Sequence, residues 1–416
     1  MSKAANVLFL KPISRSEKEG PMSSEEITRR KFIRNVAKYC GAGVAAMGLI
    51  GVDRAHGGSY DLEVPAHDGM WRMRDAAGLQ SADWRKNGFV PPDYFEKKPE
   101  TLVNGGKPVE WSHLHENYYG EGGKSIVALT MASAFDKDLK GDIRKAVKLI
   151  GGFEKSLKKT DRILIKPNMN SAHPYPGGGT DAAFLEALIL VLKEDGYENL
   201  TVADVTGPWA PQDRVAKALG IDSVCSGTKT SLIDWDKGKW MNIRNARAEY
   251  LGRFGGKDGT VAYPEDLKNY ERIIYTPVMK THYLGGITMS LKLSVGMLHR
   301  QDRAQQFHAF NHFFVAPAAA EINLPVRPDL IIMDGRRSFI SGGPSHGEQV
   351  KPGIILASGD QVACDVTGIK LLQEYYPNMA QNKITTYAWY QKQILQAVKV
   401  GVGYAKKDED IKLLLG

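Results

Sequence analysis

The strongest constraint on the fold is an alternation of short apolar runs and amphipathic segments that begins at residue 125. Apolar runs at 125–130, 162–165 and 200–205 predict buried strands, and the segments 138–150 and 181–195 have the spacing of amphipathic helices. Strands that alternate with helices in this way form right-handed βαβ units. The sequence therefore predicts an α/β fold with a mostly parallel sheet.

The second half of the chain continues this pattern around one chemically rich stretch, residues 272–299. Its sequence is RIIYTPVMKTHYLGGITMSLKLSVGMLH. A strand is expected over 272–279 and an amphipathic helix over 287–298, so residues 280–286 would form a strand-to-helix loop that turns at its two glycines. Two more strands are expected at 328–333 and 353–357.

Polar side chains follow several of these strands, at the point where each strand ends. Ligands of α/β proteins bind at the carboxyl ends of the strands. The sequence therefore predicts a site that combines Lys166, Asn168, Asp204, Lys280, His282, Asp334 and the turn residues Gly343 and His346. In this hypothesis Lys166 and Lys280 hold an anionic substrate, and His282 transfers a proton while Asp334 or Asp204 orients it.

Lys292 and His299 are further substrate-binding candidates on or just after the expected helix 287–298. The alternative gives Lys292 a solvated helix face and places His299 near the helix C-terminus, where a cation is favourable.

Three residues are candidate metal ligands. His113 and His115 are alternate residues, which share one face of a strand, and Asp204 ends a strand. A hydrogen-bonded or solvated loop is the more common explanation for two histidines at this spacing, so the cofactor stays open, with a metal ion as one option.

Cysteine usage and charge exclude several classes of protein. The three cysteines, Cys40, Cys225 and Cys364, form no CxxC, CxxCH or ferredoxin motif, which disfavours an internal iron–sulfur cluster and c-type haem. Cys225 and Cys364 are expected to be two buried thiols, with a disulfide between them as the alternative. Of the formal net charge of +8, the first 40 residues supply about +5, and no basic stripe follows, so nucleic acid is not an expected partner.

The N-terminal region, residues 1–55, has the features of a twin-arginine export signal. The sequence TRRKFIR at 28–34 matches the consensus, and the apolar run 41–52 is too short to span a membrane. The chain is therefore expected outside the cytoplasm, in the periplasm, with only transient membrane contact during export. The alternative is a basic amphipathic surface helix, and no Ala-x-Ala cleavage site follows.

Residues 56–123 form an irregular arm that is rich in glycine, proline and aromatic residues. Its tryptophans Trp71, Trp84 and Trp111 need burial, so the arm is expected to wrap around the following domain or a protein partner. The α/β domain is expected over 124–405, with an insertion at 222–270, and residues 406–416 form a C-terminal tail.

Seven motifs, in this order, give residues 125–405 a resemblance to the domain of unknown function 362 family. They are ILIKPN at 163–168, VADVTG at 202–207, VMKTH at 278–282, SLK with the downstream histidine at 290–299, DLIIMDG at 329–335, GGPSHG at 342–347 and ASGDQVACD at 357–365. In that family asparagine usually follows the lysine that corresponds to Lys292, whereas Leu293 stands here. Many relatives also carry a cysteine-rich ferredoxin segment that this chain lacks. The resemblance implies the fold and the candidate residues but no agreed reaction.

Three functional hypotheses follow. The first is an exported protein that binds an anionic small molecule or a metal ion and transfers a proton. The second is a non-catalytic subunit whose arm, 56–123, docks onto an exported redox enzyme or metalloenzyme. The third, suggested by a loose resemblance to nickel-dependent lactate racemase, is an isomerase with a metal cofactor.

The export signal makes the first testable prediction. Replacing both Arg29 and Arg30 with Lys should leave the protein in the cytoplasm, because the export machinery requires the arginine pair. Fractionation of host cells with an antibody against the chain measures this, and Arg34→Lys is the matched control. Unchanged periplasmic recovery of the double variant would contradict the assignment.

Overall fold

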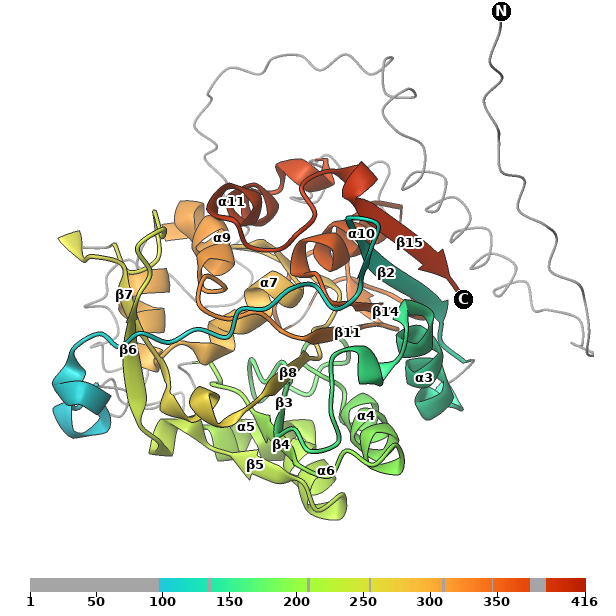
Figure 1. Cartoon of the computed structure of the whole chain (residues 1–416), viewed down its shortest axis with the longest axis horizontal. Helices are drawn as coiled ribbons and strands as arrows, with labels where there is room; N and C mark the ends of the chain where they lie inside the picture. Colours follow the sequence, from blue (N-terminus) through green and yellow to red (C-terminus); the bar gives the residue numbers. More distant parts are fainter. Residues whose placement is uncertain are drawn as a thin grey trace, which may run out of the picture.

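A computed structural model describes residues 97–133, 136–207, 210–253, 256–308, 311–345, 347–374 and 387–416. Figure 1 shows their arrangement. Outside the described residues lie the N-terminal region 1–55 with its twin arginines and Cys40, and also Trp71, Trp84 and His346.

A nine-stranded sheet organises the described part of the chain, in the order β1-β2-β14-β11-β8-β3-β4-β5, with β15 also paired to β2. Its strands are β1 (Gly120–Glu121), β2 (Lys124–Met131), β3 (Ile163–Lys166), β4 (Leu200–Ala203), β5 (Ser231–Ile233), β8 (Arg272–Tyr275), β11 (Leu330–Gly335), β14 (Ile354–Ser358) and β15 (Ile411–Leu415). The five strands from β11 to β5 are mutually parallel, whereas β14 runs antiparallel to both of its neighbours, β11 and β2. The predicted α/β fold with a mostly parallel sheet is confirmed.

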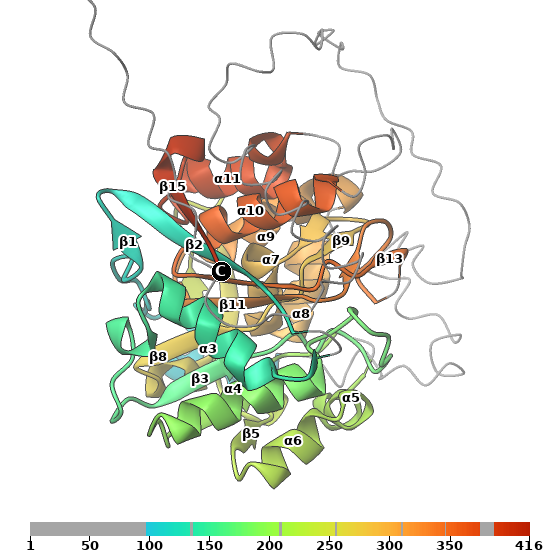
Figure 2. The same cartoon turned by 90° about the vertical axis from the view of Figure 1, so that its right-hand side faces the viewer.

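Both faces of the sheet are covered, because successive residues of each strand enter different hydrophobic clusters. Ile163 and Ile165 pack on one face with α3 (Leu139–Ile150), α4 (Ala182–Glu194), α5 (Gln212–Leu219) and α6 (Ile221–Gly227). Leu164 packs on the opposite face with α7 (Ser290–Leu293), α9 (Asn311–Glu321), α10 (Gln361–Glu374) and α11 (Lys392–Val400). Figure 2 shows α10 and α11 on one side of the sheet and α3 and α4 on the other.

The two helices predicted in the first half are confirmed, and their caps explain where they begin. The Oδ1 of Asp138 accepts a hydrogen bond from the Gly141 amide at 2.9 Å, and the Oδ1 of Asp181 accepts one from the Phe184 amide at 3.1 Å. The first helix ends at Gly151, whose φ of 114° is left-handed and suits glycine.

The central stretch differs from its prediction. β9 (Lys280–His282) pairs antiparallel with β10 (Gly286–Thr288), so residues 280–286 belong to a hairpin, and Gly286 takes the positive φ of its turn. The predicted helix over 287–298 is therefore wrong. Its first residues pair in the hairpin, a single α-helical turn follows in α7, and a 3-10 turn, η10 (Ser294–Met297), completes it. Tertiary strand pairing has overridden helical spacing.

Two smaller hairpins and the ends of the chain complete the domain. Residues 222–270 contain α6 and β5 as well as the hairpin of β6 (Trp240–Arg244) and β7 (Thr260–Pro264), whose Trp240 and Tyr263 are buried in the same cluster as Leu164. A second hairpin pairs β12 (Ser338–Phe339) with β13 (Gln349–Val350). The C-terminal segment, expected as a tail, supplies β15.

The described part of the arm, residues 97–123, packs along its own domain. Leu102 forms a β-bridge with Trp240, and His113 forms one with Val326. Half-buried Trp111 packs against the same hydrophobic cluster. In Figure 1 this segment crosses the face of the domain before it enters β2.

Cys225 and Cys364 are free and buried, as predicted. Burial raises the pKa of Cys225 to about 11 and raises that of Cys364 well above its usual value, so both thiols are protonated. Among the described residues no helix has the length and apolar character that would let it cross a membrane.

Candidate functional site

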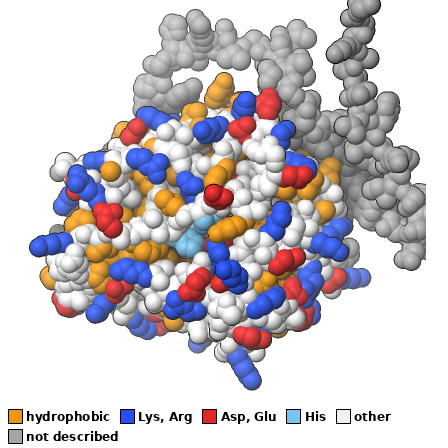
Figure 3. All heavy atoms as spheres, in the orientation of Figure 1, with side chains coloured by type: hydrophobic (Ala, Val, Ile, Leu, Met, Phe, Trp, Pro, Cys, Tyr) orange, Lys and Arg blue, Asp and Glu red, His pale blue; other side chains and the backbone are white. Residues whose placement is uncertain are grey.

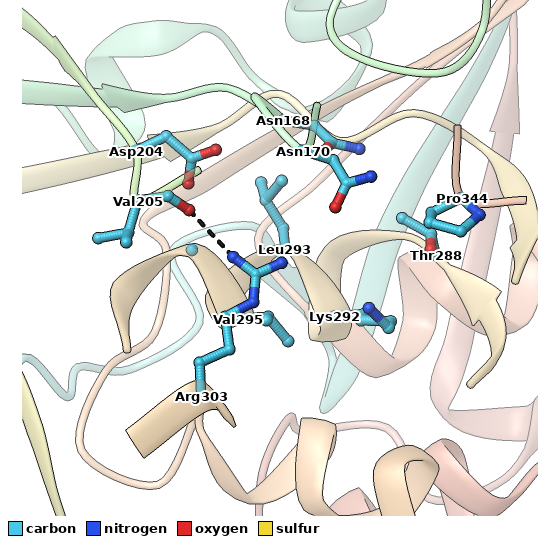
Figure 4. Close-up of a pocket in the computed structure, with 11 residues that line it drawn as sticks. Asn168, Asn170, Asp204, Val205, Thr288, Lys292, Leu293, Val295, Arg303 and Pro344 are labelled. Atoms are coloured by element: carbon cyan, nitrogen blue, oxygen red, sulfur yellow. Dashed lines mark hydrogen bonds between the residues drawn. The ribbon is translucent and has the colours of Figure 1, made fainter. Parts of the chain in front are cut away.

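A small cavity lies where the carboxyl ends of β3 and β4 meet the hairpin and helical turn of the central stretch. Its volume is about 30 Å³, which accommodates about two water molecules. Figure 4 shows its lining, which comprises Asn168, Asn170, Asp204, Val205, Thr288, Lys292, Leu293, Val295, Gly296, Arg303 and Pro344.

An ion pair between Lys166 and Asp204 forms one wall. The Lys166 Nζ lies 2.6 Å from the Asp204 Oδ1, and both side chains are almost completely buried. The other carboxylate oxygen accepts the Met169 amide at 2.7 Å. Burial lowers the pKa of Lys166 and raises that of Asp204, while each charge opposes the shift of the other. Burial thus disfavours the charged form of each group, and the ion pair favours it.

Gly296 allows the central stretch to approach this pair. A Cβ at position 296 would lie 1.8 Å from the Asp204 Oδ1 and 2.7 Å from the Lys166 Nζ. The Gly296 carbonyl also accepts the Val205 amide at 2.8 Å, so the turn is bonded to the end of β4. Any larger residue at 296 would displace the carboxylate or the turn.

Lys292 reaches the same cavity from α7. Asp365 of α10 holds the start of this helix, because its carboxylate accepts the Ser290 amide at 2.8 Å and the Leu291 amide at 2.9 Å. Lys292 forms neither an ion pair nor a hydrogen bond with any residue that the structure describes, and its Nζ lies 5.8 Å from the centre of the Phe307 ring. Burial, and then the charges of Arg303 and Lys280, lower its pKa well below the usual value.

Further hydrogen-bond donors surround the cavity. The Arg303 Nη1 donates to the carbonyls of Val205 and Thr206 at 3.2 and 3.0 Å, and burial lowers the pKa of Arg303 to about 10. The Nδ2 of Asn168 and the Oγ1 of Thr288 are buried and bond to no described residue. In the view of Figure 4, Asn168 and Asn170 lie on one side of the cavity and Arg303 and Lys292 on the other.

The charges of this lining do not balance. Asp204 is the one carboxylate among the lining residues, and it already pairs with Lys166, so no carboxylate of the lining is left to neutralise the charged form of Lys292. Buried polar groups without partners are costly, and each of these groups can donate to an oxygen atom. The arrangement therefore suits a small oxyanion.

Lys280 and Gly343 support the cavity wall instead of lining it. The buried Nζ of Lys280 donates to the carbonyls of Gly178 and Pro344, and burial lowers its pKa to about 7. Gly343 has a φ of 77°, and a Cβ there would lie 2.1 Å from the Thr281 carbonyl oxygen. These contacts hold Pro344 at the cavity.

The other candidates have different surroundings. The Nδ1 of His282 accepts the amides of Leu284 and Gly285 at 3.0 and 3.1 Å, which closes the hairpin turn. Arg336 donates to both carboxylate oxygens of Asp334, at 3.0 and 2.8 Å. The Nδ1 of His299 caps α8 (Arg300–Asp302), and burial lowers the pKa of His299 to about 3.

The metal candidates are not together. Asp204 lies beside the Lys166 ammonium at the cavity, whereas His113 and His115 lie with Asp329, the residue that precedes β11. Asp329 therefore lies at the amino-terminal ends of the parallel strands, on the opposite side of the sheet from their carboxyl ends and the cavity.

Several residues of the cavity were not predicted from the sequence. Gly296 and Thr288 lie inside the stretch that was interpreted as one helix, which concealed the turn and the hairpin. Arg303 lies beyond that stretch with no local signal for a site. Only its position after the His299 motif could have drawn attention to it.

Comparison with known proteins identifies the family. Residues 163–370, half of the chain, match the family described as Domain of unknown function (DUF362), and the protein belongs to this family. The matched region contains every residue that lines the cavity. The chain is also 24% identical to the thylakoid-associated protein sll1697 of Synechocystis sp. over 269 residues, which cover 60% of this chain and 75% of that protein.

The ion pair makes a prediction about stability. Lys166→Met should lower the free energy of unfolding by about 3–5 kcal/mol, because it leaves the Asp204 carboxylate buried without its cation. Urea unfolding of the purified chain measures this change. The double variant Lys166→Met with Asp204→Asn should recover much of the loss, since it removes the unpaired carboxylate. A loss below about 1 kcal/mol in the single variant would contradict this role.

Proposed function

We propose that the protein binds a small oxyanion, or the anionic end of a larger molecule, in the cavity at the carboxyl ends of the parallel strands. The observation that carries this proposal is the buried amino group of Lys292, which lines the cavity without a carboxylate partner among the described residues. A bound carboxylate or phosphate group would stabilise the charged form of this side chain. It would also accept hydrogen bonds from the unsatisfied donors of Asn168 and Thr288.

Proton transfer is the second part of the proposal. Asp204 both lines the cavity and lies 2.6 Å from the Lys166 Nζ, so the pair can give a proton to a bound molecule or take one from it. Lys292 in its charged form, together with Arg303, would stabilise negative charge that develops on that molecule. This assigns the acid–base role to the Lys166–Asp204 pair, while His282 and Lys280 hold the surrounding loops.

The oxyanion proposal predicts a ligand-induced increase in stability. At about one hundred times its dissociation constant, phosphate, sulfate or a small carboxylate should stabilise the full chain by roughly 2.7 kcal/mol, visible as a rise in melting temperature against a chloride control at equal ionic strength. Lys292→Met should abolish this rise. Without ligand the variant should be as stable as the parent or more stable, because a buried polar group without a hydrogen-bond partner is replaced by an apolar side chain.

Two further measurements make the test specific. Lys145→Met removes one positive charge from an exposed position on α3 and should retain the full response. Anion affinity should rise as the pH falls, because the anion binds the charged form of Lys292 and burial holds the pKa of the free protein low. A response that survives in Lys292→Met, or a chain that binds none of these anions, would contradict the proposal and favour the docking alternative.

A further inference from the structure

We propose that His113, His115 and Asp329 bind a divalent transition-metal ion of the zinc class. The site lies at the end of the sheet where the parallel strands begin. The three side chains each offer one ligand atom, and these atoms lie within 4.8 Å of one another. The two histidines come from the arm, and the carboxylate comes from the residue that precedes β11. The site is therefore distinct from the oxyanion cavity and does not depend on its function.

Backbone hydrogen bonds fix the arm where the two histidines can act together. The His113 amide donates to the Pro325 carbonyl at 2.7 Å, and the His113 carbonyl accepts the Arg327 amide at 2.9 Å. This pairing makes residues 113–115 locally strand-like, so both imidazoles point to the same side.

The protonation of His115 leaves room for a cation. Its Nδ1 lies 2.7 Å from the Glu116 carbonyl oxygen, which only accepts, so Nδ1 carries the proton. In the neutral ring Nε2 then holds a lone pair. This Nε2 is buried without a hydrogen-bond partner among the described residues, and it lies 3.7 Å from the Asp329 Oδ1. That distance is too long for a hydrogen bond, and two lone pairs that face each other are satisfied by a metal ion between them.

The spacing suits zinc after a small adjustment. Bonds of about 2.0–2.2 Å in tetrahedral geometry place neighbouring ligand atoms about 3.4 Å apart. The present separations from Asp329 are 2.8 Å for the His113 Nε2 and 3.7 Å for the His115 Nε2, on either side of that value. A metal ion would replace the hydrogen bond between His113 and Asp329, and water would occupy the fourth position.

The surrounding groups orient the ligands in the manner of a metal site. Glu116 fixes the tautomer of His115, whose ring stacks on Tyr118 with centroids 5.0 Å apart. The Asp329 carboxylate accepts the Arg272 Nη1 at 2.9 Å and the Ile273 amide at 2.8 Å. Asp161 also lies 3.2 Å from the Arg272 Nε, so two carboxylates share this arginine.

The site lies just below the surface. The side chains of His113 and His115 are 15% and 10% exposed, while that of Asp329 is fully buried. Figure 3 shows histidine side chains at the surface near the middle of the face that the arm crosses in Figure 1. A bound ion would connect the arm to the start of β11, so metal binding should also stabilise the packing of the arm.

Metal titration of the full chain tests this proposal. After treatment with a chelator and its removal, one equivalent of Zn²⁺ should bind by calorimetry and raise the melting temperature. His115→Gln keeps a polar side chain of similar size but should weaken Zn²⁺ binding by at least about 100-fold. Co²⁺ should give visible absorption bands with the parent chain, and these bands should be absent in His115→Gln.

The matched control is His173→Ala, which removes an exposed histidine in the loop before α4 and should bind Zn²⁺ like the parent. If His115→Gln fails to fold, His113→Gln takes its place, with the same expected loss. Absence of stoichiometric Zn²⁺ binding to the parent would overturn the proposal, and so would an equal loss of binding in His173→Ala.

Discussion

The cavity at the carboxyl ends of the parallel strands depends on the buried ion pair between Lys166 and Asp204. Removing two charges from water is expensive, and a separation of 2.6 Å together with the Met169 amide compensates for that cost only while the surrounding backbone stays in place. The two side chains come from neighbouring parallel strands, β3 and β4. The turn that covers them needs a residue without a Cβ, which Gly296 provides.

Lys292 has no comparable compensation, because it forms no ion pair with a carboxylate of the described residues. Lys292 is held at the cavity because Asp365 anchors the start of α7 from a different helix, α10. Arg303 is held by carbonyl groups at the end of β4. Burying these two basic side chains costs stability, as burial of polar groups at functional sites commonly does. The proposed ligand, which supplies negative charge, would explain why these groups remain there.

The sequence predicted the strands and helices whose faces alternate regularly. β3 and α4 were predicted because Ile163, Ile165 and the Asp181 cap all favour the same local structure. The helix expected over 287–298 failed because its apolar spacing also fits a hairpin strand followed by two short helical turns. The choice between these depends on pairing with β9 and on contacts with Asp365 and Val205, which no local pattern reveals.

The same limit applies to the candidate site. Lys166, Asn168, Asp204 and Lys292 were identified because each follows a strand or belongs to the central stretch, and the structure brings all four together. Lys280 and His282 had the same kind of signal, yet their contacts are with loop carbonyls and turn amides. Side-chain direction decides whether a residue at a strand end faces a cavity or holds a loop. Local sequence does not reveal this direction.

The most direct measurement is a crystal structure of the full chain soaked with selenate, whose anomalous scattering locates the anion without reference to the protein. The proposal requires a selenium peak in the cavity, within hydrogen-bond distance of the Lys292 Nζ and the Asn168 Nδ2. A cavity that contains only water, or a Lys292 side chain that bonds to a carboxylate of the protein, would contradict the oxyanion site.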